Sequence, residues 1–207
     1  MRAHLLVACL AFAAAPASAQ REHADLGFQL GFSRARFGGD QSGLGESRSG
    51  SAFGVFLGTP VAGPVNAQAE IFLVKKGGGL TAVVGTTPLE VSVQLIYIEM
   101  PLLARFVIPL GGRLHPNVFG GGALAINIGC DIQAEVPGLL AQQACDEGGN
   151  LAVNAFDVGA VIGAGFEYDW RDSNARLEIR QTVGLREVSP GDPAKNRAWA
   201  ILFGITL

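Results

Sequence analysis

Four arginines and four carboxylates are the residues of this sequence best placed to do chemistry, because they stand inside stretches that otherwise alternate between apolar and small residues. They are Glu70, Arg105, Asp157, Glu167, Arg176, Glu178, Arg180 and Arg186. Opposed guanidinium and carboxylate groups in a narrow interior would either line a path for ions or form salt bridges that fill the interior. Buried charges are tolerated when they are paired, so the sequence favours the second interpretation.

Groups for enzyme catalysis are scarce. Beyond residue 19 the sequence has two histidines, His23 and His115, and neither stands with a serine and an aspartate in a recognisable triad pattern. We find no nucleophile elbow, phosphate-binding loop or cluster with metal-ligand spacing. We therefore expect no enzyme activity, no metal and no cofactor.

The composition describes a chain that is apolar on average but nowhere for long. Of 207 residues, 49% are hydrophobic, 16% are charged and 29 are glycine. This excludes a disordered chain, which needs low hydrophobicity and high charge. Beyond the N-terminus, no stretch reaches the ~20 apolar residues that a spanning helix needs. The net charge of −3 gives no support for nucleic-acid binding.

The N-terminus has the three parts of a secretory signal peptide. Arg2 precedes an apolar run, and the segment Ala17-Ser18-Ala19 places small residues at the cleavage site. We expect residues 1–19 to be the signal and residues 20–207 to form a single domain. The segment ending at Cys9 resembles a lipoprotein signal, but its apolar run is too short for one.

Two cysteines, Cys130 and Cys145, remain after removal of the signal. In an exported protein such a pair is typical of a disulfide that closes a loop. A metal site is disfavoured, because no histidine or further cysteine stands near them.

Eight stretches alternate with period 2, which is typical of strands with two different faces. They are residues 25–33, 51–59, 65–73, 90–108, 117–128, 154–168, 175–186 and 199–207. Long connections follow the first, third, fifth and seventh, and short turns follow the second, fourth and sixth. This order predicts an all-β fold, an eight-stranded antiparallel up-and-down barrel.

The fourth stretch changes parity. Its apolar face begins on odd positions, including Tyr97, and ends on even positions such as Leu102 and Phe106. A parity change implies a one-residue β-bulge, and Pro101 is the residue that a bulge would best accommodate. Glu99, beside this bulge, could face either side of the sheet.

The apolar face of the barrel is predicted to point outward into lipid. The opposite face carries small and polar residues that suit a narrow lumen, and lysine is nearly absent from the sequence. Aromatic residues mark the strand ends as a membrane girdle would, with Tyr168 and Trp170 at one end and Trp199 at the other. A soluble barrel that carries an apolar ligand is the alternative. With both termini in the periplasm, the long connections are extracellular.

Several segments resemble a known family. The run from Tyr97 to Leu103, the segment Val118 to Gly122 and the segment Phe156 to Gly165 resemble the PorT-like outer-membrane β-barrel domain. The tail with Phe203, Ile205 and Leu207 is similar to the C-terminal signal read by the outer-membrane insertion machinery, although the last residue is not aromatic. The resemblance implies an eight-stranded barrel of the OmpA/OmpX-like class in a Gram-negative outer membrane.

We therefore expect a monomeric outer-membrane protein with a structural or surface-interaction role through its loops, and with a lumen plugged by charged side chains. A narrow pore for solutes or ions is the second hypothesis. Expected partners are outer-membrane lipid, lipopolysaccharide and the insertion machinery. The segments Lys75-Lys76 and Arg34 with Arg36 are cationic groups that could contact lipopolysaccharide phosphates, but the sequence favours the interpretation that they are ordinary solvated loop charges.

Overall fold

The computed structural model describes residues 24–38, 46–84, 87–136, 139–145, 154–171, 173–188 and 195–207. The predicted signal peptide, residues 1–19, lies outside them. The strands are β1 (Asp25–Gly38), β2 (Glu46–Ala62), β3 (Val65–Val84), β4 (Thr87–Val107), β5 (Leu114–Val136), β6 (Leu139–Ala144), β7 (Phe156–Trp170), β8 (Ser173–Glu187) and β9 (Lys195–Thr206). The described part of the chain contains no helix that is long and apolar enough to span a membrane.

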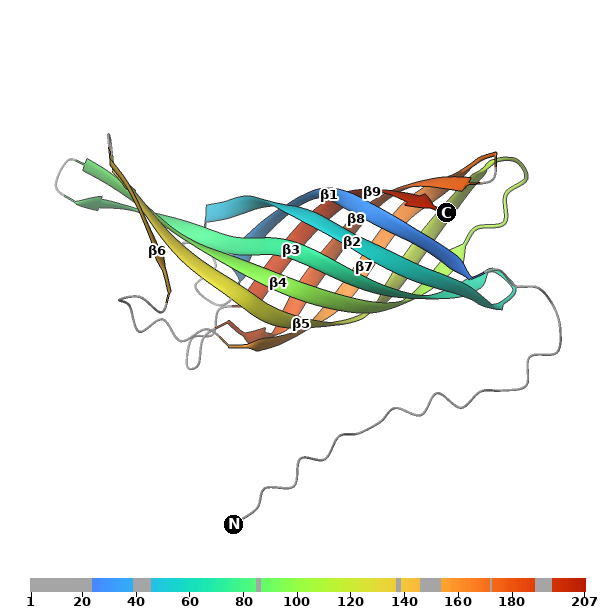
Figure 1. The fold of residues 1–207 in the computed structure, drawn as a ribbon, viewed down its shortest axis with the longest axis horizontal. Helices are drawn as coiled ribbons and strands as arrows, with labels where there is room; N and C mark the ends of the chain where they lie inside the picture. The colour runs from blue at the N-terminus through green and yellow to red at the C-terminus, as the bar shows by residue number, and fades with distance from the viewer. Residues whose placement is uncertain are drawn as a thin grey trace, which may run out of the picture.

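Eight of these strands close into an antiparallel barrel (Figure 1). Neighbours in sequence pair with each other, β7 pairs with β5, and the β1–β9 pairing joins the ends of the chain. The ring contains β1, β2, β3, β4, β5, β7, β8 and β9, whereas β6 pairs with β5 alone. The predicted fold class is confirmed. The start of β1 and the C-terminus lie together at one end of the barrel, since the Leu207 N–H donates a hydrogen bond to the Leu26 carbonyl. We call this end the terminal end, and the opposite end, from which the β5–β6 hairpin extends, the hairpin end.

The apolar face of the barrel points outward, as predicted. Phe32, Leu102 and Ile162 are 79%, 67% and 65% exposed on the outer surface. On β1 the alternate residues Gln29 and Ser33 are buried inside. Water-soluble monomers rarely expose contiguous apolar patches of more than a few hundred Å², so this barrel is built to be surrounded by lipid.

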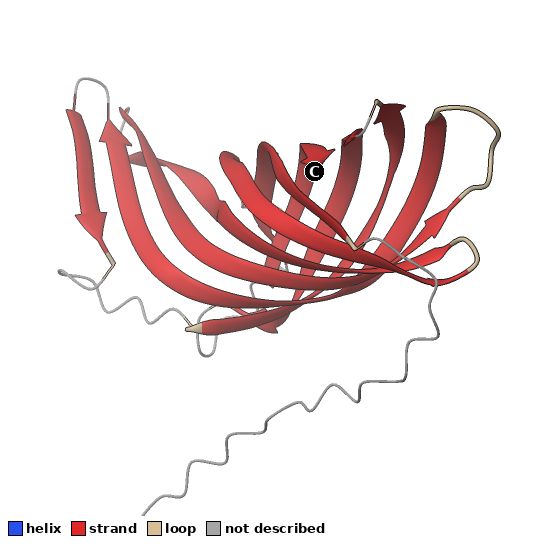
Figure 2. Cartoon of the chain, turned by 45° about the vertical axis from the view of Figure 1, so that its right-hand side comes forward, coloured by secondary structure: helices blue, strands red, loops and turns tan. Residues whose placement is uncertain are grey.

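At the hairpin end, strands continue where the sequence predicted long loops (Figure 2). β3 and β4 stay paired as far as Val84 and Thr87, and β5 pairs with β6 from Asp131 to Val136. The prediction of loops after the third and fifth strands was therefore wrong over much of their length. A period-2 signal appears only where the two faces of a strand meet different surroundings, and the run Lys75-Lys76 with three glycines shows no such alternation.

The bulge predicted at Pro101 was also misplaced. Pro101 pairs with Ala123 in an unbroken register, and the register shift falls between Ile96 and Tyr97. Because Ile96 is opposite Gly129 and Tyr97 is opposite Asn127, the extra residue is Ile128 of β5. β4 itself keeps one parity here, so Tyr97, Glu99 and Pro101 are all buried. The change of parity in the sequence of β4 instead reflects Leu95 and Tyr97, two apolar side chains that are buried in a hydrophobic cluster inside the barrel.

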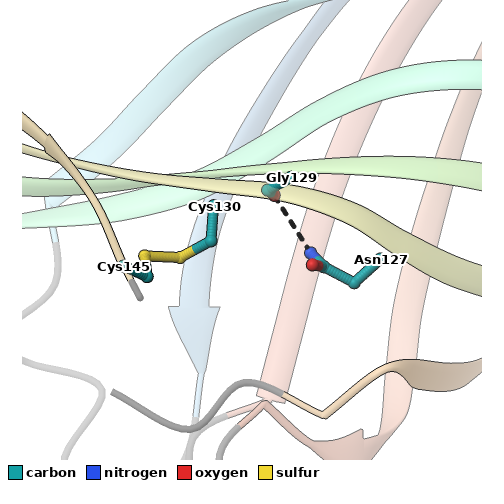
Figure 3. The surroundings of a disulfide bond; sticks show 4 residues. All are labelled: Asn127, Gly129, Cys130 and Cys145. Atoms are coloured by element: carbon teal, nitrogen blue, oxygen red, sulfur yellow. Dashed lines mark hydrogen bonds between the residues drawn. A yellow bond between two sulfur atoms is a disulfide. The ribbon is translucent and has the colours of Figure 1, made fainter. Parts of the chain in front are cut away.

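A disulfide joins Cys130 of β5 to Cys145 at the end of β6 (Figure 3). The two Cα atoms are 5.4 Å apart, and the backbone N–H of Cys145 donates a hydrogen bond to the Cys130 carbonyl at 3.1 Å. Next to it, the Asn127 side chain donates to the Gly129 carbonyl at 3.3 Å. The predicted pair thus fixes the base of the β5–β6 hairpin where it leaves the barrel.

Candidate functional site: a charged network inside the lumen

The centre of the lumen network comes from one strand. Arg176, Glu178 and Arg180 occupy alternate positions of β8, and strand geometry places alternate residues on the same face. All three are buried inside the barrel. The Arg-x-Glu-x-Arg spacing therefore supplies two cations and the carboxylate between them.

Glu178 is the common acceptor of three guanidinium groups. Its Oε1 lies 2.5 Å from Arg105 Nη2 and 3.7 Å from Arg176 Nε, and its Oε2 lies 2.7 Å from Arg180 Nη2. The Glu178 side chain is 0% exposed. In a site that excludes water, this carboxylate stabilises three cations that would otherwise repel one another.

Two further carboxylates complete the charge balance. Glu70 Oε2 accepts a hydrogen bond from Arg180 Nη1 at 2.5 Å, and Glu167 Oε1 lies 2.8 Å from Arg176 Nη2 in an ion pair. Three arginines thus meet three glutamates, and the network carries no net formal charge. Neutral amides fill the remaining positions: Gln29, Gln68 and Asn117 supply side-chain oxygens to these arginines.

Each arginine also lies against an inward-facing phenylalanine. Arg176 is 4.1 Å from the centre of the Phe56 ring, and Arg105 is 4.6 Å from that of Phe119. Cation–π attraction favours such contacts when the groups are desolvated. The Phe119 ring lies over Gly163, where an added Cβ would be 2.3 Å from its Cζ. Gly163 thus leaves the space that this ring occupies.

A second cluster lies nearer the hairpin end. Lys76 Nζ is 2.6 Å from Glu99 Oε2, both side chains are buried, and the ammonium lies 5.6 Å from the centre of the Tyr97 ring. The placement of Lys76 in a loop, facing solvent or lipopolysaccharide, was wrong, because Lys76 belongs to β3 and is buried in the lumen. Its neighbour Lys75 points outward and is exposed, as strand alternation requires.

A small cavity separates the two clusters. Its volume is about 30 Å³, and Arg180, Thr182, Lys76 and Glu99 supply polar groups to its lining. That space holds one or two waters, since a single water needs roughly 10–15 Å³ on this measure.

Of the eight charged residues singled out from the sequence, six form the central network and two do not. Asp157 is buried, but it lies with Asn196 and Tyr97 near the second cluster. Arg186 is exposed. Its assignment to the lumen was wrong because the β8–β9 register shifts after Val183, so the strict alternation does not extend to residue 186.

The predicted girdle and tail residues lie on the outer face. Tyr168 and Trp170 are exposed towards the terminal end of β7, and Trp199 is exposed in the first half of β9. Phe203 near the end of β9 and Leu207 just beyond it are exposed, with Ile205 half-buried between them. These positions match the sequence-based placement of each residue along its strand.

Sequence reasoning missed the neutral and aromatic members of the network. The missed residues are Gln29, Gln68, Asn117, Phe56, Phe72 and Phe119. The sequence could have placed each of them on the inner face, because they alternate with the lipid-facing positions of their strands. It could not have predicted their contacts, because these depend on which strands meet across the lumen.

The charged groups of the network are paired with one another. The described residues contain no group of three or more His, Cys, Asp and Glu side chains arranged to bind a metal ion. Guanidinium groups stay protonated at accessible pH, and here they are occupied by carboxylates. This arrangement is suited to filling and stabilising the barrel.

Comparison with known proteins gives the family. Residues 5–205 match the model of the outer membrane protein beta-barrel domain. The chain therefore belongs to this family and is an outer-membrane β-barrel protein of a Gram-negative bacterium. The outward apolar face and this membership exclude the alternative of a soluble carrier barrel.

Solved structures show similar barrels at low identity. Neisserial surface protein A is 11% identical, with a TM-score of 0.48, over 90% of this chain and 99% of that one. OprG from Pseudomonas aeruginosa is 12% identical, with a TM-score of 0.48, over 89% and 95%. Ail of Yersinia pestis is 9% identical, with a TM-score of 0.45, over 89% and 99%. No curated protein matches the chain.

We predict that Glu178→Gln destabilises the folded barrel by about 3–5 kcal/mol, because it leaves three buried guanidinium groups without their shared carboxylate. Urea unfolding in detergent, with folding scored by the heat-dependent gel shift, measures this loss. Glu187→Gln, at an exposed position of the same strand, is the matched control and should change stability by less than about 0.5 kcal/mol. Equal unfolding midpoints for the two variants would contradict the central role of Glu178.

Proposed function

We propose that this barrel is a surface-interaction protein that acts through the strands extending beyond its hairpin end. The observation that carries the proposal is the extension itself, built from Leu80–Val84 of β3, Thr87–Val91 of β4, Asp131–Val136 of β5 and β6. A hairpin fixed by a disulfide and held away from the membrane is well suited to contact another protein. We place it outside the cell, with both termini in the periplasm. The Tyr97-to-Leu103 motif further supports a PorT-like type.

The outer edge of β6 supplies the means of contact. Because the Cys145 N–H bonds to Cys130, alternation directs the backbone groups of Leu140, Gln142 and Ala144 away from β5. No described strand pairs with that edge. Free strand edges are templates for the addition of an extended peptide. The proposed partner is therefore an extended segment of another polypeptide.

Ala144→Pro tests this edge, since proline removes one outward N–H and is tolerated at a strand edge. Ala144→Ser, which keeps that N–H, is the matched control. Extended peptides are selected from a random 12-residue library against the wild-type barrel in lipid nanodiscs. We expect their affinity to fall at least tenfold for Ala144→Pro and to persist for Ala144→Ser. Equal binding by both variants would exclude strand addition at β6.

Outer-leaflet lipid is a second proposed partner. Arg36 of β1 lies directly opposite Arg197 of β9, Lys195 lies two positions before Arg197 on the same face, and all three are exposed. Like charges placed opposite each other are destabilising. No ion pair joins these three to a described carboxylate. Phosphate groups of lipopolysaccharide would satisfy them beside the apolar band.

Removal of these charges should weaken lipopolysaccharide binding selectively. For Arg36→Ala with Arg197→Ala we expect at least a tenfold loss of affinity for purified lipopolysaccharide, measured with the barrel in detergent at fixed salt. The matched control is Arg113→Ala with Arg171→Ala, which removes two exposed arginines at the terminal end. Equal losses in both pairs would show that net charge alone governs the binding.

The plugged lumen is the third part of the proposal, and a narrow pore is its competitor. Paired arginines and glutamates across the lumen support the plug, because an eight-stranded barrel is only wide enough for its own side chains. In planar bilayers, protein that passes the heat-shift test should add no steady conductance steps. Reproducible ion-selective steps would favour the pore.

A further inference from the structure

A buried polar group near the hairpin end of the lumen stands apart from the central network. Asp157 of β7, Asn196 of β9 and Tyr97 of β4 are 8%, 2% and 1% exposed. Asn196 Nδ2 donates to Asp157 Oδ2 at 3.2 Å and to the Tyr97 hydroxyl at 3.3 Å. Three strands thus bring a carboxylate, an amide and a phenol together.

Two oxygens of this group have no donor. Asp157 Oδ1 and Asn196 Oδ1 are both buried, and neither accepts a hydrogen bond in the described structure. Asn196 already directs its nitrogen at the carboxylate and the phenol, so both side chains leave an acceptor free. Buried acceptors without a partner are costly, and a charged one is the most costly.

The charge of Asp157 is also uncompensated. The three buried arginines meet Glu70, Glu167 and Glu178, and Lys76 meets Glu99. No salt bridge to Asp157 is present among the described residues. The sequence of the connections at 39–45, 146–153 and 189–194 contains no lysine or arginine that could supply one. An unpaired buried carboxylate is destabilising, and a bound cation from outside the chain would neutralise it.

We propose that Asp157 and Asn196, with the Tyr97 hydroxyl, bind one hard divalent cation of the Ca²⁺ type at the mouth of the lumen. Carboxylate, amide and hydroxyl oxygens are ligands that such cations prefer, and waters complete their coordination. With one carboxylate the affinity is expected to be weak, with Kd on the order of 10⁻⁴–10⁻³ M, which is typical of extracellular sites. The proposal does not depend on what the β6 edge binds.

Terbium luminescence tests the site directly, because a nearby tyrosine sensitises Tb³⁺. In the full barrel folded in detergent, we expect Tb³⁺ emission that Ca²⁺ displaces. Asp157→Asn should weaken Tb³⁺ binding at least tenfold, whereas Glu187→Gln, which removes an exposed carboxylate, should leave it unchanged. Equal displaceable binding in wild type and Asp157→Asn, or none in wild type, would overturn the proposal.

Thermal unfolding gives an independent readout that does not depend on Tb³⁺. With a chelator, Asp157→Asn should unfold at the same temperature as wild type or higher, because it removes an unpaired charge. Millimolar Ca²⁺ should raise the Tm of wild type and leave that of Asp157→Asn unchanged. If acidification raises the wild-type Tm and Ca²⁺ does not, a proton neutralises Asp157 and the cation site is excluded. If neither acidification nor Ca²⁺ changes the wild-type Tm, the free oxygens bind water and the cation site is excluded.

Discussion

The contact between Glu178 and three arginines is the interaction on which the rest of this barrel depends. A closed ring of eight strands leaves an interior too narrow for bulk water and lined by the polar face of every strand. Charges in such a space must be paired, and breaking one buried pair costs several kcal/mol. Glu178 forms ion pairs with Arg105 of β4 and with Arg176 and Arg180, its neighbours on the same face of β8. The lumen thereby links strands that are distant in sequence.

The outer surface is shaped by the same cost of leaving polar groups without partners, here in lipid instead of in the lumen. Lipid offers no hydrogen bonds, so the backbone must be satisfied within a closed sheet and the outward side chains must be apolar. Phe32, Leu102 and Ile162 meet this requirement. Arg36 and Arg197 lie where the apolar band ends, beyond Trp199, and cationic groups there suit a surface of anionic lipid headgroups.

Beyond the barrel, strands are free of both constraints. The extension of β3, β4, β5 and β6 has neither a lumen to fill nor lipid to face, and a disulfide holds the base of its last hairpin. No described strand pairs with the outer edge of β6, and Glu178 meets Arg105 inside the lumen beneath it. Asp157, at the boundary between these regions, is the buried acid that the chain's own cations leave unpaired in the described lumen.

By itself, the sequence determined the class of fold, the outward apolar face, the cysteine pair and seven of the eight charges in the lumen, because strand alternation is a local property with period 2. Only the tertiary structure decided which charges meet, since Glu178 and Arg105 are brought together by barrel closure. It also placed the bulge at Ile128 instead of Pro101, turned Lys76 inward and left Arg186 exposed. Register between neighbouring strands depends on the pairing of whole strands, and no single strand carries that information.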